Sequence, residues 1–241
     1  MDEGCEHMGK IPYLALVGSL MYTSMGTHPD ITYAVGNLGK YSVNPGKAHW
    51  TAAQQVLRYL NGAQDLGLVL GGQQPITLQG YVDSDYTQDL DDRKSILGYT
   101  FSLGSGAISW SSKKQATIAG SSTEAEYVTA DHTTKEAMWL HTLLSLIGHP
   151  QRGPTLIWCD NMGAILLIQN LVFHACTKHI DIKHHYVWDQ YKSKDVTFKY
   201  VPTSDNSTDI LTKGLDHPKH WKFLSMLGLE NKLNPMNLPL T

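Results

Sequence analysis

Residues Gly80–Tyr86 read GYVDSDY and place two carboxylates, Asp83 and Asp85, at the end of an apolar run. From Ile76 to Asp85 apolar and polar residues alternate, which is typical of a half-buried strand. An acidic strand end of this kind fits three hypotheses: a polymerase metal motif, a different metal site, or an acidic turn. The choice among them depends on the other carboxylates that the fold brings to this strand.

The pattern that follows this strand predicts an α/β fold with a mixed sheet flanked by helices. Upstream, residues 11–70 are mostly helical in periodicity, and GGQQP at 71–75 is the best candidate linker. We expect three parts: a smaller helical segment at 1–74, the α/β domain at 75–215, and a C-terminal helix with a tail at 216–241. The elements expected after the first strand are a hairpin turning at 104–106, a helix over 121–148, a strand over 155–161, helices over 162–170 and 177–194, a strand over 196–203 and helices from 207 and 217.

Composition narrows the class of protein. The chain has 241 residues, 41% of them hydrophobic, which is enough for one substantial core. Its three cysteines do not form a disulfide framework or a C-x-x-C pair, and no apolar run approaches a membrane span, so we expect an intracellular protein, cytoplasmic or nuclear, without a membrane partner. A formal charge of -3 argues against a generally basic nucleic-acid binder, so a polyanion would have to bind to local basic patches on the surface. Trp110, Trp139 and Trp158 lie in apolar patterns and are expected in the core.

Four acids fall where an open α/β sheet exposes side chains: Asp83 late in the first strand, Glu126 early in the long helix, Asp160 at a strand end and Asp209 at a helix start. Strand ends and helix starts meet at one edge of such a sheet. Converging carboxylates repel one another unless cations lie among them, and hard cations such as Mg²⁺ or Mn²⁺ take oxygen ligands. The pattern therefore predicts a site for two such cations.

Each acid also has a structural explanation. Asp83 or Asp85 alone is more often a turn residue than a metal ligand. Glu126 fits a capping box with Thr123 as the N-cap, Asp160 fits the N-cap of the next helix, and Asp209 fits a solvated acid in a first helical turn. Only the combination of the four favours a metal site.

From Gly80 onward the chain resembles the ribonuclease H domain of copia-type LTR retrotransposons. The resemblance rests on a colinear series of motifs: DRKSILGYTFSLG, ISWSSKKQ, SSTEAEY, CDN, TKHIDIKHH and TDILTK. Upstream, PYLALVGSLMYTSMGTHPDITYAVGNLGKY and the sequence after it are similar to the segment that joins the polymerase part to the ribonuclease H part of these polyproteins. The resemblance implies a ribonuclease H-like fold and covers nearly the whole chain.

The resemblance further implies that Asp83, Glu126, Asp160 and Asp209 are catalytic and hold the two metal ions. Asp83 is preferred to Asp85 because a small residue, Ser84, follows it, and the second acid of E-A-E-Y is preferred to the first. The polymerase motif Y-x-D-D is absent, so polymerase activity is not expected. By resemblance, Ser122, Thr123 and Asn161 contact the substrate, and Ser84 is a further candidate. Two basic groups are candidate phosphate tracks: Lys113 and Lys114, which follow a strand, and Lys178, His179, Lys183, His184 and His185, which lie at helical spacing.

The implied activity is hydrolysis of the RNA strand of an RNA:DNA hybrid by two metal ions, and the implied partners are the hybrid and the polymerase part of a retrotransposon Pol. Three hypotheses remain open. The first is this endoribonuclease. The second is a domesticated or inactive fragment that binds hybrid or a protein partner, and the third is a related nuclease or integrase chemistry on DNA. Caps and turns explain Ser122, Thr123 and Asn161 equally well, and a solvated helix face explains the second basic group.

Overall fold

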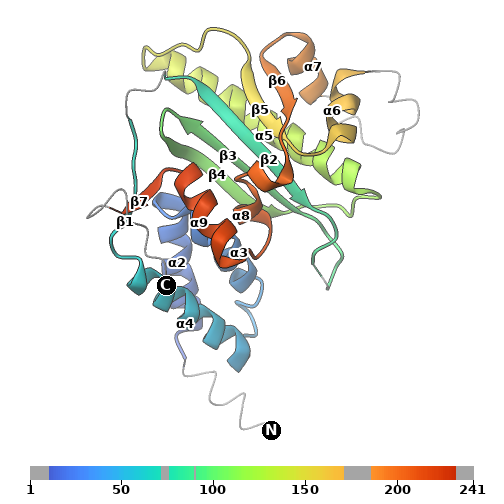
Figure 1. Ribbon diagram of the computed structural model, residues 1–241. Coiled ribbons are helices and arrows are strands. Elements are labelled where there is room, and N and C mark those ends of the chain that lie inside the picture. The colour runs from blue at the N-terminus through green and yellow to red at the C-terminus, as the bar shows by residue number, and fades with distance from the viewer. Residues whose placement is uncertain (1–10, 72–75, 90, 171–185, 232–241) are drawn as a thin grey trace.

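The computed structural model describes residues 11–71, 76–89, 91–170 and 186–231 of the chain (Figure 1). Its centre is a five-stranded mixed sheet in the order β4-β3-β2-β5-β6. The mixed sheet and its flanking helices confirm the predicted fold class. The strands are β2 (Leu78–Asp85), β3 (Ile96–Leu103), β4 (Gly106–Lys114), β5 (Thr155–Cys159) and β6 (Val196–Tyr200).

Strand direction decides where the polar strand ends lie. β2, β3 and β4 form an antiparallel meander whose turn includes Gly104 at φ 74°, a conformation that favours glycine. β2, β5 and β6 run parallel to one another, with Val82 opposite Cys159. Because parallel strands end at the same edge, the carboxylates of β2 and the residue after β5 meet there.

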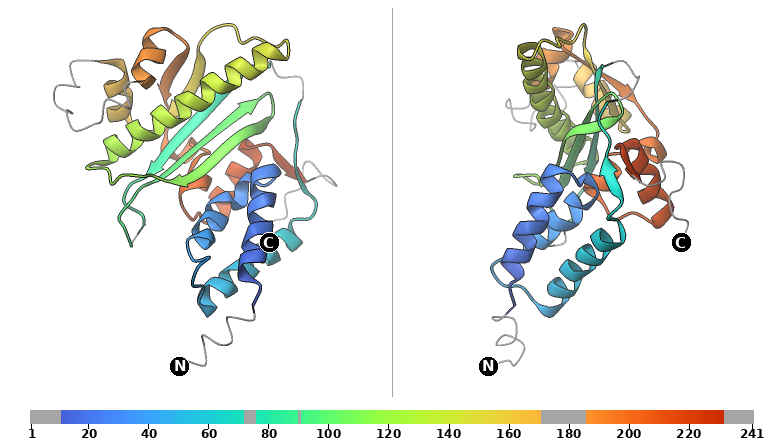
Figure 2. Two further views of the ribbon diagram at one scale, coloured as in Figure 1. Left: turned by 180° about the vertical axis from the view of Figure 1, so that it is seen from behind. Right: turned by 90° about the vertical axis from the view of Figure 1, so that its left-hand side faces the viewer.

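Helices cover both faces of the sheet. The long helix α5 (Ser122–Leu146) packs on one face against β2 and β3, together with α6 (Met162–Gln169) and α7 (Tyr186–Lys192). The core on this face includes Val82, Phe101, Tyr127 and Ile157, all at most 1% exposed. On the other face lie α8 (Asp209–Thr212) and α9 (His217–Met226), as the right-hand view of Figure 2 shows. The site therefore forms where two helical layers reach one sheet edge.

The segment before the sheet is helical, as predicted. It comprises α2 (Tyr13–Gly26), the 3-10 turn η1 (Pro29–Ile31), α3 (Thr32–Gly39) and α4 (Lys47–Gly62). α3 packs against β4 and α8, which places this segment beside the sheet. A two-stranded antiparallel sheet joins β1 (Leu66–Leu68) to β7 (Leu229–Asn231), so the predicted first and third parts of the chain pair with each other.

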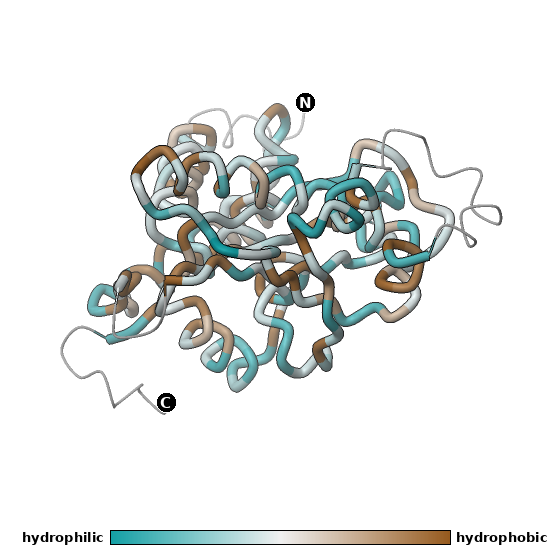
Figure 3. The backbone as a smooth tube through the Cα atoms, turned by 90° about the horizontal axis from the view of Figure 1, so that it is seen from above, coloured by the Kyte–Doolittle hydropathy of each residue, from teal (hydrophilic) through white to brown (hydrophobic). Residues whose placement is uncertain are grey.

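Apolar and polar residues alternate along the described segments (Figure 3). Trp139 departs from the expectation, because it is 56% exposed on α5 and is not a core residue. Among the described residues no helix combines the length and the apolar character that crossing a membrane requires. Most of the candidate linker at 71–75 and the proposed basic track at 178–185 lie outside the described residues.

Candidate active site

The four predicted acids converge at the edge where β2 and β5 end. Single carboxylate oxygens of Asp83, Asp160 and Asp209 lie within 4.8 Å of one another. A second group at the same spacing joins Glu126, Asp160 and the sulfur of Cys159. Asp160 belongs to both groups, so it links Glu126 to the other two aspartates.

Burial makes this cluster electrostatically costly. Asp83, Glu126 and Asp209 are each at most 4% exposed, while Asp160 is half-buried. Burial raises the pKa of Asp83 to about 7, and it raises the pKa of Glu126 well above its ordinary value, with neighbouring carboxylates adding to both shifts. Burial also raises the pKa of Asp209. The chain therefore holds carboxylates close together where water cannot screen their repulsion.

The ligand set is made of oxygen atoms. Burial raises the pKa of the Cys159 thiol well above its ordinary value, and its Sγ accepts a hydrogen bond from the Asn161 N–H at 3.4 Å. A protonated, hydrogen-bonded thiol is a poor metal ligand. In contrast, Glu126 Oε2 is buried and has no hydrogen-bond partner among the described residues. A buried oxygen without a donor beside Asp160 fits a hard divalent cation.

Short contacts fix the directions of these carboxylates. The backbone N–H of Ser84 donates to Glu126 Oε1 at 3.0 Å, which ties α5 to the end of β2. Thr212 at the end of α8 donates its hydroxyl to Asp83 Oδ2. Glu126 and Asp83 are thus each held by an element other than their own.

The loop before α8 is anchored to the sheet by Asn206. Its side-chain amide donates to the carbonyl of Val82 at 2.9 Å, and its Oδ1 accepts from the Thr208 N–H at 3.3 Å. All three residues are buried. Because Val82 precedes Asp83, this contact sets the position of Asp209 relative to Asp83.

Gly98 lets α8 approach the sheet. It lies opposite Asp83 on β3, and a Cβ atom there would lie 2.6 Å from Thr212 Cγ2 and 3.2 Å from Leu211 Cβ. Any larger residue would push α8, and Asp209 with it, away from the strand.

Local hydrogen bonds show which residues cap α5 and α6. The N-cap of α5 is Ser121, whose hydroxyl accepts from the Glu124 N–H at 3.1 Å. The predicted capping box of Thr123 and Glu126 is therefore wrong, because the helix begins two residues earlier. Glu124 accepts from the Gly120 N–H at 2.8 Å and belongs to neither group of converging ligand atoms among the described residues. Asp160 is not a cap either, since Asn161 caps α6 by accepting from the Ala164 N–H at 3.0 Å.

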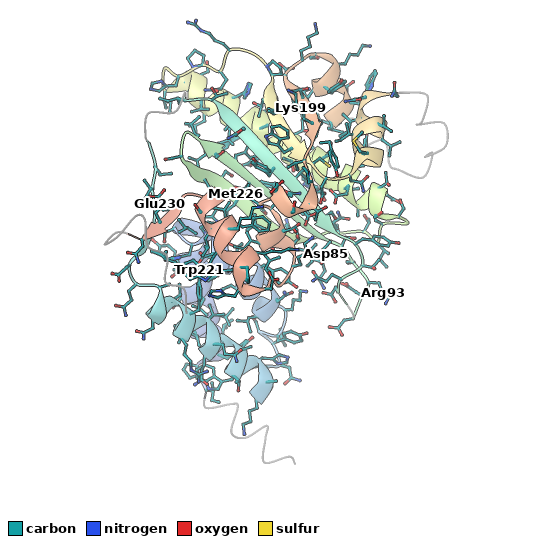
Figure 4. The ribbon with its side chains drawn as sticks, viewed as in Figure 1. Asp85, Arg93, Lys199, Trp221, Met226 and Glu230 are labelled. Carbon is teal, nitrogen blue, oxygen red and sulfur yellow. The ribbon has the colours of Figure 1, made fainter. Side chains whose placement is uncertain are left out.

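Asp85 lies at the end of β2, close to α8, as Figure 4 shows. It is half-buried and belongs to neither group of converging ligand atoms among the described residues. Burial raises the pKa of Asp85, and Lys213 opposes that shift. Within GYVDSDY, Asp83 is the acid that lies in a group of converging ligand atoms.

The predicted substrate residues fall into two sets. Ser122 is exposed, and Thr123 is partly exposed at the start of α5. Thr123 Oγ1 and Asn161 Oδ1 both lie close to Gly163, at 3.0 and 3.1 Å from the position that a Cβ would take. The N-terminal ends of α5 and α6 therefore present these side chains together, beside Asp160.

The other predicted substrate residues are placed differently. Ser84 is 8% exposed, and its hydroxyl lies 3.4 Å from the Gln115 amide, inside the protein. Lys114 forms ion pairs with Asp89 at 2.6 Å and Asp92 at 3.0 Å, whereas Lys113 is exposed. Of these three side chains, Lys113 has the exposure that a phosphate contact needs.

Three residues that position the cluster were not predicted as site residues: Asn206, Thr212 and Lys213. Thr212 and Lys213 lie inside the motif TDILTK, so the sequence contained a signal. Lys213 Nζ lies 2.8 Å from Asp209 Oδ1 and 3.7 Å from Asp83 Oδ2. Nothing in the spacing of Asn206 from Val82 indicates their contact across 124 positions.

Comparisons with known proteins give the family. The chain is 41% identical over 225 residues to the retrovirus-related Pol polyprotein from transposon TNT 1-94 of Nicotiana tabacum, which covers 93% of this chain and 17% of that protein. It is 41% identical over 217 residues to the corresponding polyprotein from transposon RE2 of Arabidopsis thaliana, covering 90% of this chain and 15% of that protein. The chain thus spans less than a fifth of the length of these two relatives.

Two further similarities are shorter. A stretch of 133 residues is 44% identical to secreted RxLR effector protein 161 of Plasmopara viticola, covering 55% of this chain and 94% of that protein. The structure of LC11-RNase H1 in complex with an RNA/DNA hybrid aligns with 56% of this chain and 94% of its own, at 13% identity and a TM-score of 0.41. No family model matches the chain. Over nine-tenths of its length the chain is a homologue of one segment of the copia-type retrotransposon Pol polyproteins, and this segment folds as a five-stranded mixed α/β sheet preceded by helices.

Proposed function

We propose that the chain is a metal-dependent endoribonuclease that hydrolyses the RNA strand of RNA:DNA hybrids. The observation that carries this proposal is the convergence of Asp83, Asp160 and Asp209 within 4.8 Å, with Glu126 joined to them through Asp160. A group of four acids, three of them buried, is unfavourable for folding alone, because each charge loses its hydration and Lys213 pairs with two of the four. Such an arrangement is expected where function requires cations.

The residues present fit Mg²⁺ or Mn²⁺. Asp83, Asp160 and Asp209 would hold one ion, and Glu126 with Asp160 would contribute to the second. All these ligand atoms are carboxylate oxygens, the donors that both cations prefer. When bound, the two cations would activate a water for attack on the phosphodiester and stabilise the departing oxygen.

The protein's own residues orient this ligand set. Ser84 donates its N–H to Glu126 Oε1 and leaves Glu126 Oε2 without a partner among the described residues, while Thr212 donates its hydroxyl to Asp83 Oδ2. Asn206 holds the loop that leads to Asp209. Fixing the ligands before the reaction removes a reorganisation cost from the chemical step.

Recognition of the RNA strand is proposed for the ends of α5 and α6. An RNA strand differs from DNA by its 2'-hydroxyls, which hydrogen-bonding side chains read in the minor groove. Thr123 and Asn161 lie together next to Asp160, and Ser122 is exposed at the start of α5, so these polar residues would face a strand bound at the cluster. Asn161 Oδ1 is used as a helix cap, which leaves its side-chain NH₂ as the donor for such a contact.

The experiment is cleavage of a labelled RNA:DNA hybrid by the purified chain with Mg²⁺ or Mn²⁺, beside Asp160→Asn. Asp160 is the acid shared by both groups, so its neutralisation should abolish cleavage. Asp205→Asn is the matched control, because Asp205 is a half-exposed acid that pairs with Lys222 outside the cluster. A DNA duplex tests for nuclease or integrase chemistry on DNA. An inert chain that binds hybrid would replace this proposal with a binding module.

A further inference from the structure

Lys213 places a cation inside the carboxylate cluster. It follows α8 directly, one helical turn after Asp209, and its Nζ lies 2.8 Å from Asp209 Oδ1 and 3.7 Å from Asp83 Oδ2. The two carboxylates are almost sealed, with side chains 1% and 4% exposed, whereas the lysine side chain is 31% exposed. The lysine therefore reaches from the surface into a buried anionic site.

This position gives Lys213 a role in the folded chain without a divalent ion. Two buried carboxylates that share one site require a compensating charge, and an ammonium group at hydrogen-bond distance supplies it. A lysine side chain is cationic at neutral pH, and the contacts of Lys213 Nζ with Asp209 at 2.8 Å and Asp83 at 3.7 Å favour the charged form. The lysine therefore carries its positive charge within the cluster.

A divalent cation and the Lys213 ammonium compete for the same oxygens. Mg²⁺ binds carboxylate oxygens at about 2.0–2.1 Å, a distance that removes the hydrogen-bonding position of an ammonium on the same lone pair. Like charges a few ångströms apart also repel strongly at low dielectric. The flexible, partly exposed stem of Lys213 allows its head group to leave. The half-buried Asp85 lies near enough to Lys213 to affect its pKa and offers a second partner.

We propose that Lys213 is a built-in counter-ion: it stabilises the carboxylate cluster when no metal is bound and is displaced from Asp83 and Asp209 when a divalent cation binds. It therefore sets the threshold concentration at which the site takes up metal. This inference rests on the proposed function only in assuming that Asp83 and Asp209 are metal ligands.

The test measures Mn²⁺ binding and stability without any substrate. Lys213→Met keeps the length and apolar stem of the side chain but removes its charge. We expect a lower melting temperature in EDTA and a Kd for Mn²⁺ about tenfold lower than that of the wild-type chain. Lys213→Arg, which keeps the charge, should retain wild-type stability in EDTA. Lys222→Met is the matched control, because Lys222 forms its 2.5 Å ion pair with Asp205 outside the cluster.

A double variant keeps the test decisive if Lys213→Met folds poorly. In Asp83→Asn/Lys213→Met one of the two carboxylates is neutral, so the loss of stability in EDTA caused by Lys213→Met should be smaller than in the wild-type background. An equal loss in both backgrounds, or an unchanged or weaker affinity for Mn²⁺ in Lys213→Met, would overturn the proposal. A chain that shows the expected Mn²⁺ behaviour but does not cut hybrid would contradict the proposed function and leave the role of Lys213 in place.

Discussion

Replacing Asp83 by asparagine tests the electrostatics of the carboxylate cluster. The Asp83 side chain is 4% exposed. Burial raises its pKa from 3.8 to about 7, with Asp209 and Asp160 adding to the shift and Lys213 and Thr212 opposing it. An asparagine has nearly the same shape and keeps an oxygen that accepts the Thr212 hydroxyl, but it has no proton to gain or lose.

The sign of the effect follows from proton binding. Between the unfolded pKa of 3.8 and the folded pKa of about 7, the folded chain binds more protons at Asp83 than the unfolded chain does. The free energy of unfolding therefore falls as the pH rises through this range. A shift of about three pKa units corresponds to about 4 kcal/mol. Without metal, Asp83→Asn should match the wild type near pH 4 and exceed its stability by up to about 4 kcal/mol at pH 8.

The assay is urea unfolding in EDTA at pH 4.5 and pH 8, repeated at pH 8 with Mn²⁺. The wild-type chain should gain stability from Mn²⁺ and Asp83→Asn should gain much less, because the variant lacks one ligand. Asp85→Asn is the matched control on the same strand, and it should keep the full response to Mn²⁺. The reasoning is refuted if Asp83→Asn is no more stable than the wild type at pH 8 in EDTA, or if it responds fully to Mn²⁺.

Two further substitutions test the supports of the cluster. Gly98→Ala should destabilise the chain by about 1–3 kcal/mol and weaken Mn²⁺ binding, because the new methyl would lie 2.6 Å from Thr212 Cγ2. Thermal unfolding and a Mn²⁺ titration measure these effects, and an unchanged melting temperature with an unchanged Kd would contradict the prediction. Tyr59→Phe should lower the free energy of unfolding by about 1–3 kcal/mol, because the hydroxyl of Tyr59 donates to the buried Asp30 at 2.5 Å. Unfolding in urea measures this loss, and a stability equal to that of the wild type would show that water or another donor replaces the hydroxyl.

The sequence predicts the layers of this fold well, because the pattern of each element is local. β2, β5 and α6 appear close to their predicted ranges, since alternation, short apolar runs and caps are properties of neighbouring residues. The capping box of α5 was predicted two residues late because SSTEAE offers overlapping choices. Ser121 with Glu124 and Thr123 with Glu126 have the same spacing, and only the tertiary contact of Glu126 with the Ser84 N–H separates them.

The residues that position the carboxylates do so through contacts with residues far away in the sequence. The sequence alone does not indicate these contacts. Asn206 reads as a loop residue, yet it is fully buried and binds the carbonyl of Val82. The sequence predicts Lys114 as a phosphate contact, yet Lys114 forms an ion pair with Asp89. Lys114 and Lys40 together hold the pKa of Asp89 well below its ordinary value. A basic residue is available to a polyanion only where no acid of the same chain approaches it.

The contact of Lys40 with Asp89 also bears on the boundary predicted near residue 74. Lys40 follows α3 and Asp89 follows β2, and their 2.7 Å ion pair joins the helical segment to the sheet. Trp110 on β4 donates its indole N–H to the Ser24 carbonyl of α2 at 2.9 Å, and β1 pairs with β7. We infer that the change near residue 74 from helical periodicity to strand alternation is a change of secondary structure and not a boundary between two independently folding units. Because α3 also packs against α8, the helical segment supports the helix that carries Asp209.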